Sequence, residues 1–340
     1  MFEKYRDFLS SFGIMLLGVL LLFFSSVYFG SEKSFSFARF PHSDKRVVEG
    51  GDVQLQTLPV SKPSVPLLDK TVAVDDLISG RLTAVAAVVL DAKTKTVLFN
   101  KNAADVRPLA SITKLMSAMV LIDSSLNWNT VATVSAEDIE GDHHIEAGEQ
   151  FTLEDLWNIA LIGSSNSAIN TLVRSAGFSR EDFAVKMNQK AQALRLLSAR
   201  FVEPTGLSEN NVASAADTAK MLIDALKFDK IFTTVQVGEY YAHPLGSKKA
   251  RRVWTTNWLL TNWVPNKFKA ENIAGKTGYI ESSGYNFAVS LSDESGHAIA
   301  AVVLGAAGNE QRFSEARDLA EWTFAHFVWP DEEGYSALVE

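Results

Sequence analysis

The chain contains no cysteine among its 340 residues. This absence excludes disulfide bridges, thiolate catalysis, cysteine-rich zinc sites and a lipid anchor attached to cysteine, although it does not identify a compartment. Positive charge is in the minority, because 32 Lys and Arg residues stand against 40 Asp and Glu residues and the formal net charge is -8. That balance argues against general binding to nucleic acid, so we expect no nucleic-acid partner.

Charge is missing altogether from one N-terminal stretch. Phe8 to Phe29 comprises 22 residues without a charged side chain, which is enough to cross a bilayer as a helix. Lys4 and Arg6 precede it, so residues 1–30 are predicted to be a single-pass anchor in the cytoplasmic membrane. The alternative is a cleaved signal peptide with Phe12 to Phe24 as its apolar core, which would give a secreted protein. Both interpretations place the remaining chain outside the cytoplasm, in the periplasm or the extracellular space.

The segment after this stretch lacks lasting hydrophobic periodicity. Residues 31–70 are therefore predicted to be a flexible linker, and they carry four prolines, Pro41, Pro59, Pro63 and Pro66. A folded domain is expected over residues 71–330. An acidic tail follows at residues 331–340, and its first charges, Asp331 to Glu333, are expected to be solvated.

Hydrophobic periodicity within the domain predicts strands at both ends and helices between them. The strand patterns cover residues 84–90, 96–100, 273–280, 287–291 and 298–304. The helical patterns cover an apolar stripe from Ile112 to Val120, a helix capped at Thr152 to Asp155, and the ranges 166–175, 180–196, 214–227 and 309–327. This order is typical of an α/β (α+β) protein, with an antiparallel sheet flanked by helices and a helical subdomain.

The string Ser111-Ile-Thr-Lys114 has the residue types of a nucleophile and its base. A serine hydroxyl attacks poorly until a neighbouring base takes its proton. Lys114 lies three positions after Ser111 on a predicted helix, and so on the same face. Burial and a nearby cation such as Lys276 would favour a neutral Lys114 that can act as general base. Taken alone, the pair could also be a capping serine and an exposed lysine, but its neighbours Ile112, Leu115 and Met116 are of the buried type.

The string Ser164-Ser-Asn166 follows an apolar helix and precedes another predicted helix. A hydroxyl at Ser164 could pass a proton between Lys114 and a leaving amine. The amide of Asn166 could orient Lys114 and hold the substrate backbone. The alternative is that Ser164 or Ser165 simply caps the next helix, which is compatible with catalysis.

The string Lys276-Thr-Gly278 lies in a predicted strand. If that strand lies at a sheet edge, an extended peptide can pair with it. Lys276 and Thr277 would then offer a charge and a hydroxyl to a C-terminal carboxylate, and Gly278 would let the substrate backbone come close. A phosphate-binding loop is excluded, because its first glycine would fall at Ala270 and no helix follows.

These strings, in this order, resemble the serine D-alanyl-D-alanine carboxypeptidases of the low-molecular-mass penicillin-binding protein family. Three longer segments carry the resemblance: Arg107 to Met116, Phe201 to Ser208, and Ala274 to Tyr279. It extends from about Val72 to about Val328 and implies a β-lactamase/transpeptidase-like fold. Phe201 to Ser208 resembles the members that lack a C-terminal β-domain, which include endopeptidases.

The resemblance implies a mechanism and partners. Ser111 would attack the carbonyl of the penultimate D-alanine of a peptidoglycan stem peptide, and Lys114 would take its proton. The backbone N–H groups of Ser111 and Tyr279 would form the oxyanion hole, and Ser164 would help protonate the leaving amine. β-Lactams would inhibit by leaving a stable ester on the serine. The membrane that residues 1–30 are predicted to cross would then be the bacterial cell membrane.

No metal and no other cofactor is implied. The cluster His143-His144-Ile-Glu146 lacks the His-Glu-x-x-His pattern, so an exposed loop is expected there. A basic cluster is formed by Lys248, Lys249, Arg251 and Arg252. It is interpreted as a solvated hairpin face rather than a site for an acidic polymer.

Three alternative functions remain open. The first is a peptidoglycan D,D-endopeptidase that cuts crosslinks. The second is a β-lactamase, which usually needs a glutamate followed four residues later by asparagine, whereas Glu203 is followed at that spacing by Leu207. The third is a β-lactam sensor, which would usually carry a signalling domain across the membrane, and only a few residues precede Phe8.

Overall fold

The computed structural model describes residues 64–69 and 78–339. The predicted membrane segment at residues 1–30 and most of the predicted linker at residues 31–70 lie outside the described residues. Within the two described ranges, no helix has both the length and the hydropathy needed to cross a membrane.

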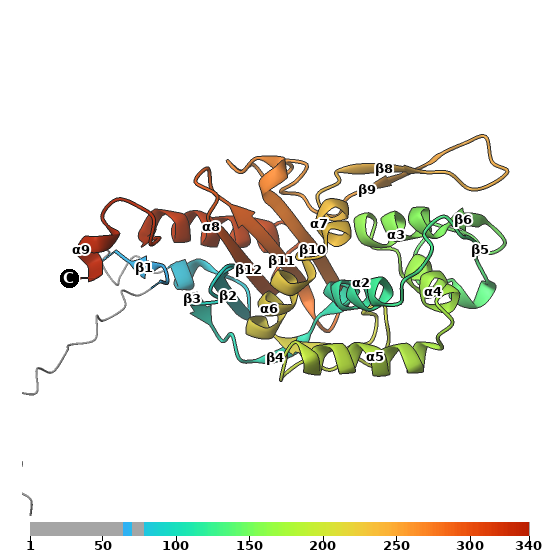
Figure 1. The fold of residues 1–340 in the computed structure, drawn as a ribbon, viewed down its shortest axis with the longest axis horizontal. Coiled ribbons are helices and arrows are strands. Elements are labelled where there is room, and N and C mark those ends of the chain that lie inside the picture. Colours follow the sequence, from blue (N-terminus) through green and yellow to red (C-terminus); the bar gives the residue numbers. More distant parts are fainter. Residues whose placement is uncertain (1–63, 70–77, 340) are drawn as a thin grey trace, which may run out of the picture. The chain divides into compact units, whose positions relative to one another are not determined.

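A five-stranded antiparallel sheet forms the centre of the described domain, in the order β10-β11-β12-β2-β3 (Figure 1). Its strands are β2 (Ala86–Asp91), β3 (Val97–Lys101), β10 (Ile273–Ile280), β11 (Gly284–Ser292) and β12 (Ala298–Ala306). The pairing of β12 with β2, for example Val302 opposite Val88, joins the two ends of the domain. Strand β10 is left at one edge of this sheet.

Alternation of side chains along the central strands divides the core into two parts. On one face, Val88 and Val302 pack with residues of α6 (Ala215–Ala225) and the helical part of the domain. On the other face, Val89 and Val303 pack with Phe313 and Leu319 of α8 (Gln311–His326). Both faces of the sheet are therefore covered, which explains why β2 is buried along its whole length.

The remaining helices gather mainly on the α6 side of the sheet (Figure 1). They are α2 (Thr113–Asp123), α3 (Leu153–Ile162), α4 (Asn166–Ser175), α5 (Arg180–Ala193) and α7 (Asp229–Thr234), with a short α9 (Tyr335–Val339) near the C-terminus. Short 3₁₀ turns are η2 (Ile78–Arg81), η3 (Ala110–Ile112), η4 (Ala136–Asp138) and η5 (Ala270–Asn272). Helix α2 is buried from Thr113 to Leu121, so it forms the centre of this helical layer.

Within the described residues, four two-stranded ribbons accompany the central sheet. They are β1 (Leu67–Leu68) with β13 (Phe327–Val328), β4 (Val106–Pro108) with β7 (Val212–Ser214), β5 (Val131–Thr133) with β6 (Gln150–Thr152), and β8 (Glu239–Ala242) with β9 (Arg251–Trp254). The sequence does not predict these pairings, because strands of two to four residues carry too little alternation.

The long elements agree closely with the sequence-based predictions. Strand β10 and helix α4 match the predicted ranges 273–280 and 166–175 to the residue. Thr152 caps α3 as predicted, since its Oγ1 accepts a hydrogen bond from the Asp155 N–H. The basic cluster at 248–252 borders the β8–β9 hairpin, but Arg251 makes a two-pronged ion pair with Glu149 at 2.6 and 2.7 Å rather than being simply solvated.

The acidic tail is solvated at Asp331, whose side chain is 73% exposed as expected, but Asp331 and the half-buried Glu332 also make contacts that the sequence does not predict. The Oδ1 atom of Asp331 lies 3.0 Å from Nε2 of His297, while Asp293 lies 3.0 Å from the other ring nitrogen. Glu332 accepts a hydrogen bond from the backbone of Trp329, whose ring stacks on His297 at 4.8 Å. These contacts hold the C-terminal segment against the turn that joins β11 to β12.

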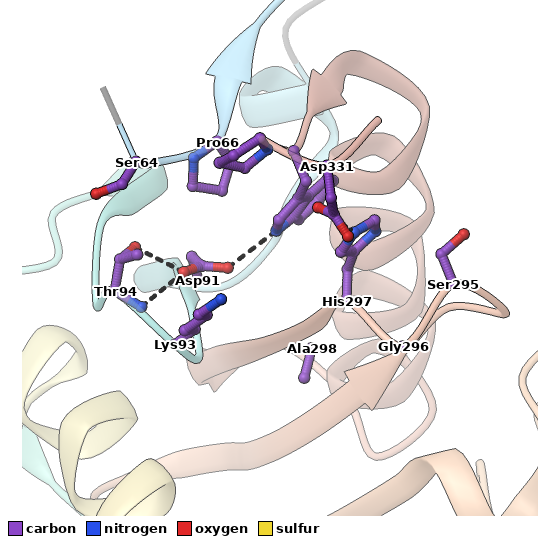
Figure 2. Close-up of a pocket in the computed structure, with 12 residues that line it drawn as sticks. Ser64, Pro66, Asp91, Lys93, Thr94, Ser295, Gly296, His297, Ala298 and Asp331 are labelled. Carbon is purple, nitrogen blue, oxygen red and sulfur yellow. Dashed lines mark hydrogen bonds and ion pairs between the residues drawn. The ribbon is translucent and has the colours of Figure 1, made fainter. Parts of the chain in front are cut away.

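The same contacts border a pocket of about 410 Å³ at this end of the domain (Figure 2). Figure 2 shows His297 and Asp331 side by side at one wall and Asp91 and Thr94 at the opposite wall. Asp91 accepts hydrogen bonds from Thr94 and from the indole N–H of Trp329, at 2.7 and 3.0 Å. The pocket contains none of the residues of the three sequence strings.

His297 should make the stability of this end depend on pH. Burial alone would lower the pKa of His297, but its hydrogen bonds to Asp293 and Asp331 outweigh burial and raise it. The contribution of protonated His297 to the free energy of unfolding is therefore fully present below the unfolded pKa of about 6.5. It is lost as pH rises through the pKa of His297 in the folded protein. We expect His297→Gln to lower the melting temperature by roughly 2–4 °C at pH 6 and by less at pH 8.5, measured by scanning calorimetry.

The exposed His243 provides a matched control. His243→Gln makes the same chemical change on the β8–β9 hairpin, away from these carboxylates, and should leave the pH dependence as in the parent. An equal loss of melting temperature for His297→Gln at pH 6 and pH 8.5 would contradict the inference that protonated His297 is held by Asp293 and Asp331.

Candidate active site

Ser111 lies in the 3₁₀ turn η3, directly before helix α2. The predicted (i, i+3) arrangement brings Lys114 beside it, with Nζ of Lys114 2.9 Å from Oγ of Ser111. Ser111 is partly exposed, whereas Lys114 is completely buried. The hydroxyl is therefore accessible from outside while its basic partner is shielded from water.

Two glycines hold the backbone of this nucleophile turn. Ala110 has a φ of +50°, in the region that side chains disfavour. A Cβ atom on Gly206 would lie 2.0 Å from the Ala110 carbonyl oxygen, and one on Gly278 would lie 2.5 Å from the Leu109 carbonyl oxygen. The turn is thus clamped between the 201–208 segment and strand β10, at distances that only glycine permits.

The Lys114 amine also contacts two oxygens, Oδ1 of Asn166 at 2.6 Å and the Thr205 carbonyl at 2.8 Å. Burial lowers the pKa of Lys114 to about 7, against an opposing effect of the carboxylates of Glu203, Asp142 and Glu140. A substantial neutral fraction of Lys114 is therefore present near neutral pH. That fraction can accept the proton of the Ser111 hydroxyl.

Lys276 was expected to lie close enough to Lys114 for their charges to repel, and that repulsion is among the causes that lower the pKa of Lys276. Lys276 is also completely enclosed, with 1% of its surface exposed. Its pKa is lowered well below the usual value, first by burial and then by the charges of Lys114 and Arg312. Two lysines thus share one enclosed site, and a bound anion would relieve the cost of charging them.

Asn166 is the first residue of helix α4, and Ser165 is its cap, accepting a hydrogen bond from the Ala168 N–H at 3.0 Å. Asp142 holds this helix start from outside, because its Oδ2 atom accepts the backbone N–H groups of Asn166 and Ser167 at 2.8 and 2.9 Å. Burial would raise the pKa of Asp142, but these and other hydrogen bonds keep it below its usual range. The charged carboxylate thereby fixes the helix end that presents Asn166 to Lys114.

Ser164 precedes that cap in a left-handed conformation, with a φ of +65°. Such a backbone is unfavourable for serine and persists only where the surroundings enforce it. Its Oγ atom accepts a hydrogen bond of 2.7 Å from Nζ of Lys276. Ser164 therefore connects the helical side of the site with strand β10.

Strand β10 supplies the third string at the edge of the sheet, where a peptide can pair with it. Thr277 and Thr256 share a hydrogen bond of 2.6 Å between their hydroxyls. Tyr279 is 51% exposed, and its ring stacks on Tyr285 at 4.4 Å. The strand thus offers a hydroxyl, a close backbone at Gly278 and an aromatic surface along one line.

Arg312 and the two carboxylates Glu203 and Asp142 were missed by the sequence analysis. Arg312 lies on α8 and donates to the Gly278 carbonyl at 3.1 Å, so it lies behind the strand that carries Lys276. Burial lowers the pKa of Arg312 to about 10. Arg312 and Asp142 act through contacts with segments distant in the sequence, so no local spacing marks them. Glu203 instead bonds residues of its own loop, so the segment Phe201 to Ser208 was the signal that could have indicated it.

Contacts link six of the eight predicted residues, and the other two, Thr277 and Tyr279, flank Gly278 on strand β10. Lys114 contacts Ser111 and Asn166, Lys276 contacts Ser164, and Gly278 abuts the nucleophile turn. Within the described residues, the side chains grouped closely enough to hold a metal are Asp293, His297 and Glu332, which include neither His143 nor His144. The site at Ser111 has the parts needed for acyl transfer: a nucleophile, a base, a hydroxyl relay and a cationic pocket.

Comparison with known proteins agrees with the resemblance found in the sequence. A family model described as D-alanyl-D-alanine carboxypeptidase matches residues 70–308. The D-alanyl-D-alanine endopeptidase of Pseudomonas aeruginosa is 32% identical over 249 residues, covering 71% of this chain and 77% of that protein. The D-alanyl-D-alanine endopeptidase of Escherichia coli is 29% identical over 271 residues, covering 77% and 84% respectively.

Solved structures show the same fold. Penicillin-binding protein D2 of Listeria monocytogenes, in its ampicillin-bound form, superposes with a TM-score of 0.63 at 25% identity, covering 72% of this chain and 98% of that chain. The DD-transpeptidase of Streptomyces K15 superposes with a TM-score of 0.65 at 23% identity, with the same coverage. The predicted antiparallel sheet with flanking helices is confirmed by this likeness.

The pKa of Lys114 predicts how acylation of Ser111 depends on pH. We expect the second-order rate constant for labelling by fluorescent penicillin to rise through a midpoint near pH 7, because only the neutral amine accepts the proton. Between pH 5 and pH 8 the increase should be on the order of a hundredfold. Lys114→Ala should remain folded by circular dichroism and should not be labelled. A flat profile in the parent protein would rule out Lys114 as the base.

Proposed function

Because this chain belongs to the D-alanyl-D-alanine carboxypeptidase family, we propose that it is an exported serine peptidase that cleaves D-alanyl-D-alanine in peptidoglycan stem peptides. The observation that carries the proposal is the contact of 2.9 Å between the Ser111 hydroxyl and a fully buried Lys114 whose pKa is about 7. The ampicillin-bound relative supports inhibition by β-lactams.

In the acylation step, neutral Lys114 takes the Ser111 proton while Oγ bonds to the carbonyl carbon of the penultimate D-alanine. The carbonyl oxygen gains negative charge and accepts hydrogen bonds from the backbone N–H groups of Ser111 and Tyr279. The close packing of Gly278 on the nucleophile turn supports this arrangement, because it brings β10 beside Ser111.

Collapse of that intermediate breaks the amide bond and requires a proton on the leaving amine. Ser164 is suited to pass it on, because Lys276 fixes its hydroxyl at 2.7 Å on the side of the site facing β10. Water then attacks the acyl-enzyme with Lys114 again as base, which releases the shortened stem peptide and restores the Ser111 hydroxyl.

The terminal carboxylate of the substrate belongs in the cationic pocket. The Lys276 amine beside Ser164 can take up positive charge, Arg312 lies behind β10, and the Thr277 hydroxyl supplies a neutral donor. Because the pKa of empty Lys276 is depressed, a bound carboxylate would favour its charged form and add binding energy to substrates with a free terminus.

Cleavage of crosslinks is the second candidate function. It uses the same acyl group and differs only in the leaving amine, which then belongs to a second stem peptide. The observation in its favour is that the Pseudomonas aeruginosa and Escherichia coli relatives are both named endopeptidases. The family model itself is described as a carboxypeptidase.

We further propose that residues 1–30 anchor the enzyme in the bacterial cell membrane and that residues 31–70 extend the domain toward the cell wall. The uncharged stretch from Phe8 to Phe29 supports the anchor. Peptidoglycan lies outside the cytoplasm, so the proposed substrate is consistent with this topology.

A digest of peptidoglycan fragments tests the activity. The full chain, solubilised in detergent, should remove one terminal alanine from pentapeptides, and Ser111→Ala should lower that rate by at least about 10³-fold. Products are identified by mass spectrometry. Conversion of crosslinked dimers to monomers without loss of terminal alanine would instead establish the endopeptidase, and no Ser111-dependent product would refute both.

Fractionation tests the anchor. After expression in a bacterium, the full chain should sediment with membranes and resist extraction by salt and alkali, because a 22-residue apolar helix inserts stably. Deletion of residues 1–30 should abolish both export and sedimentation. A soluble exported protein with a new N-terminus would instead indicate a cleaved signal peptide.

A further inference from the structure

The segment from Phe201 to Ser208 is organised around the carboxylate of Glu203. Its two oxygens accept five hydrogen bonds from Thr205 N, Thr205 Oγ1, Gly206 N, Ser208 N and Asn211 Nδ2, at 2.6, 2.6, 2.7, 3.3 and 2.8 Å. Local bonds to backbone N–H groups of this kind specify a loop conformation. Removal of the carboxylate would leave several of these donors without their acceptor.

This loop makes two direct contacts with the nucleophile and its base. The Thr205 carbonyl accepts a hydrogen bond of 2.8 Å from Lys114 Nζ, and Gly206 packs against the Ala110 carbonyl directly before Ser111. A third contact, of 2.6 Å, joins the Ser117 hydroxyl to the Pro204 carbonyl one helical turn further along α2. Two of the residues that Glu203 binds, Thr205 and Gly206, are therefore the ones that contact Lys114 and the nucleophile turn.

Glu203 also acts on Lys114 through its charge. Among the groups that oppose the effect of burial on the pKa of Lys114, Glu203 is the largest, followed by Asp142 and Glu140. The cation facing the same site is Lys276, which Lys114 repels. The fraction of neutral Lys114 at a given pH thus reflects a balance to which the 201–208 loop contributes negative charge.

We propose that Glu203 is a positioning residue for acylation: it holds the Thr205 carbonyl on Lys114 and Gly206 against the nucleophile turn. This inference rests on the proposed function, in which Lys114 deprotonates Ser111. Glu203 itself need not touch the substrate, because both effects pass through Lys114 and Ala110.

Three variants separate charge from position. Glu203→Gln keeps the size of the side chain and removes its charge, Glu203→Asp keeps the charge and withdraws it by one methylene, and Glu209→Gln makes the same neutralisation at an exposed residue of the same region. The second-order rate constant for labelling by fluorescent penicillin is measured from pH 5 to pH 9 for each full-length protein. Rates are normalised to the active sites titrated by prolonged labelling, so that any unfolded fraction does not enter.

The acid limb of the profile is the pH range in which the labelling rate rises with pH. For Glu203→Gln we expect this limb to move to lower pH by about one unit, because loss of a negative charge disfavours the protonated form of Lys114. The plateau, which is the maximal labelling rate constant at high pH, should fall at least about tenfold because Lys114 is less well held. Glu203→Asp should show a similar plateau loss with the limb unmoved, and Glu209→Gln should match the parent.

An unmoved limb in Glu203→Gln, or unchanged plateaus in both Glu203 variants, would overturn the inference. If Glu203→Gln fails to fold, an undiminished plateau in Glu203→Asp still overturns the positioning role. Failure of the proposed function has a different signature, because the parent protein would then lack penicillin labelling or an acid limb near pH 7.

Discussion

The enclosure of the Lys114 amine is the constraint on which the active site depends. Burying an ammonium group is expensive, and a protein can reduce that cost by leaving the group neutral or by surrounding it with acceptors and negative charge. This chain does both. Burial brings the pKa of Lys114 to about 7, while Glu203, Asp142 and Glu140 prevent it from falling further. The result is an amine that can change protonation state within the physiological range, as a general base requires.

The two carboxylates Glu203 and Asp142 have parallel structural roles. Each binds the backbone N–H groups of a separate segment, and each segment presents one oxygen to Lys114: the Thr205 carbonyl from one and Asn166 Oδ1 from the other. The same side chains therefore fix the position of the amine and supply the charge that tunes it. Removal of either carboxylate would change both the position and the pKa of the Lys114 amine. Substitutions that preserve the charge and substitutions that preserve the size therefore give different information.

Much of the fold was predictable because its long elements carry strong patterns. The fully buried β2, the continuous apolar run of β12 and the cap at Thr152 are properties of contiguous residues. The strings beginning at Ser111, Ser164 and Lys276 were recognisable for the same reason. By contrast, the contact between His297 and Asp331 and the contact between Lys114 and the Thr205 carbonyl depend on groups that tertiary folding brings together. Charge along the sequence indicated solvation for the acidic tail, and Asp331 is 73% exposed, but its contact with His297 is visible only in the folded structure.

The distinction between trimming and crosslink cleavage must arise outside the groups that perform acylation. In the proposed mechanism both reactions form the same ester at Ser111, so the base, the clamped turn and the oxyanion donors would not discriminate between them. The leaving amine is different: it carries either a single terminal residue or a second stem peptide. Ser164 faces that side of the reaction in the proposed mechanism, and its strained backbone is fixed between the α4 cap and Lys276. Preference between the two substrates therefore depends on how much room the surface beyond Ser164 and the edge of β10 leaves for a second peptide.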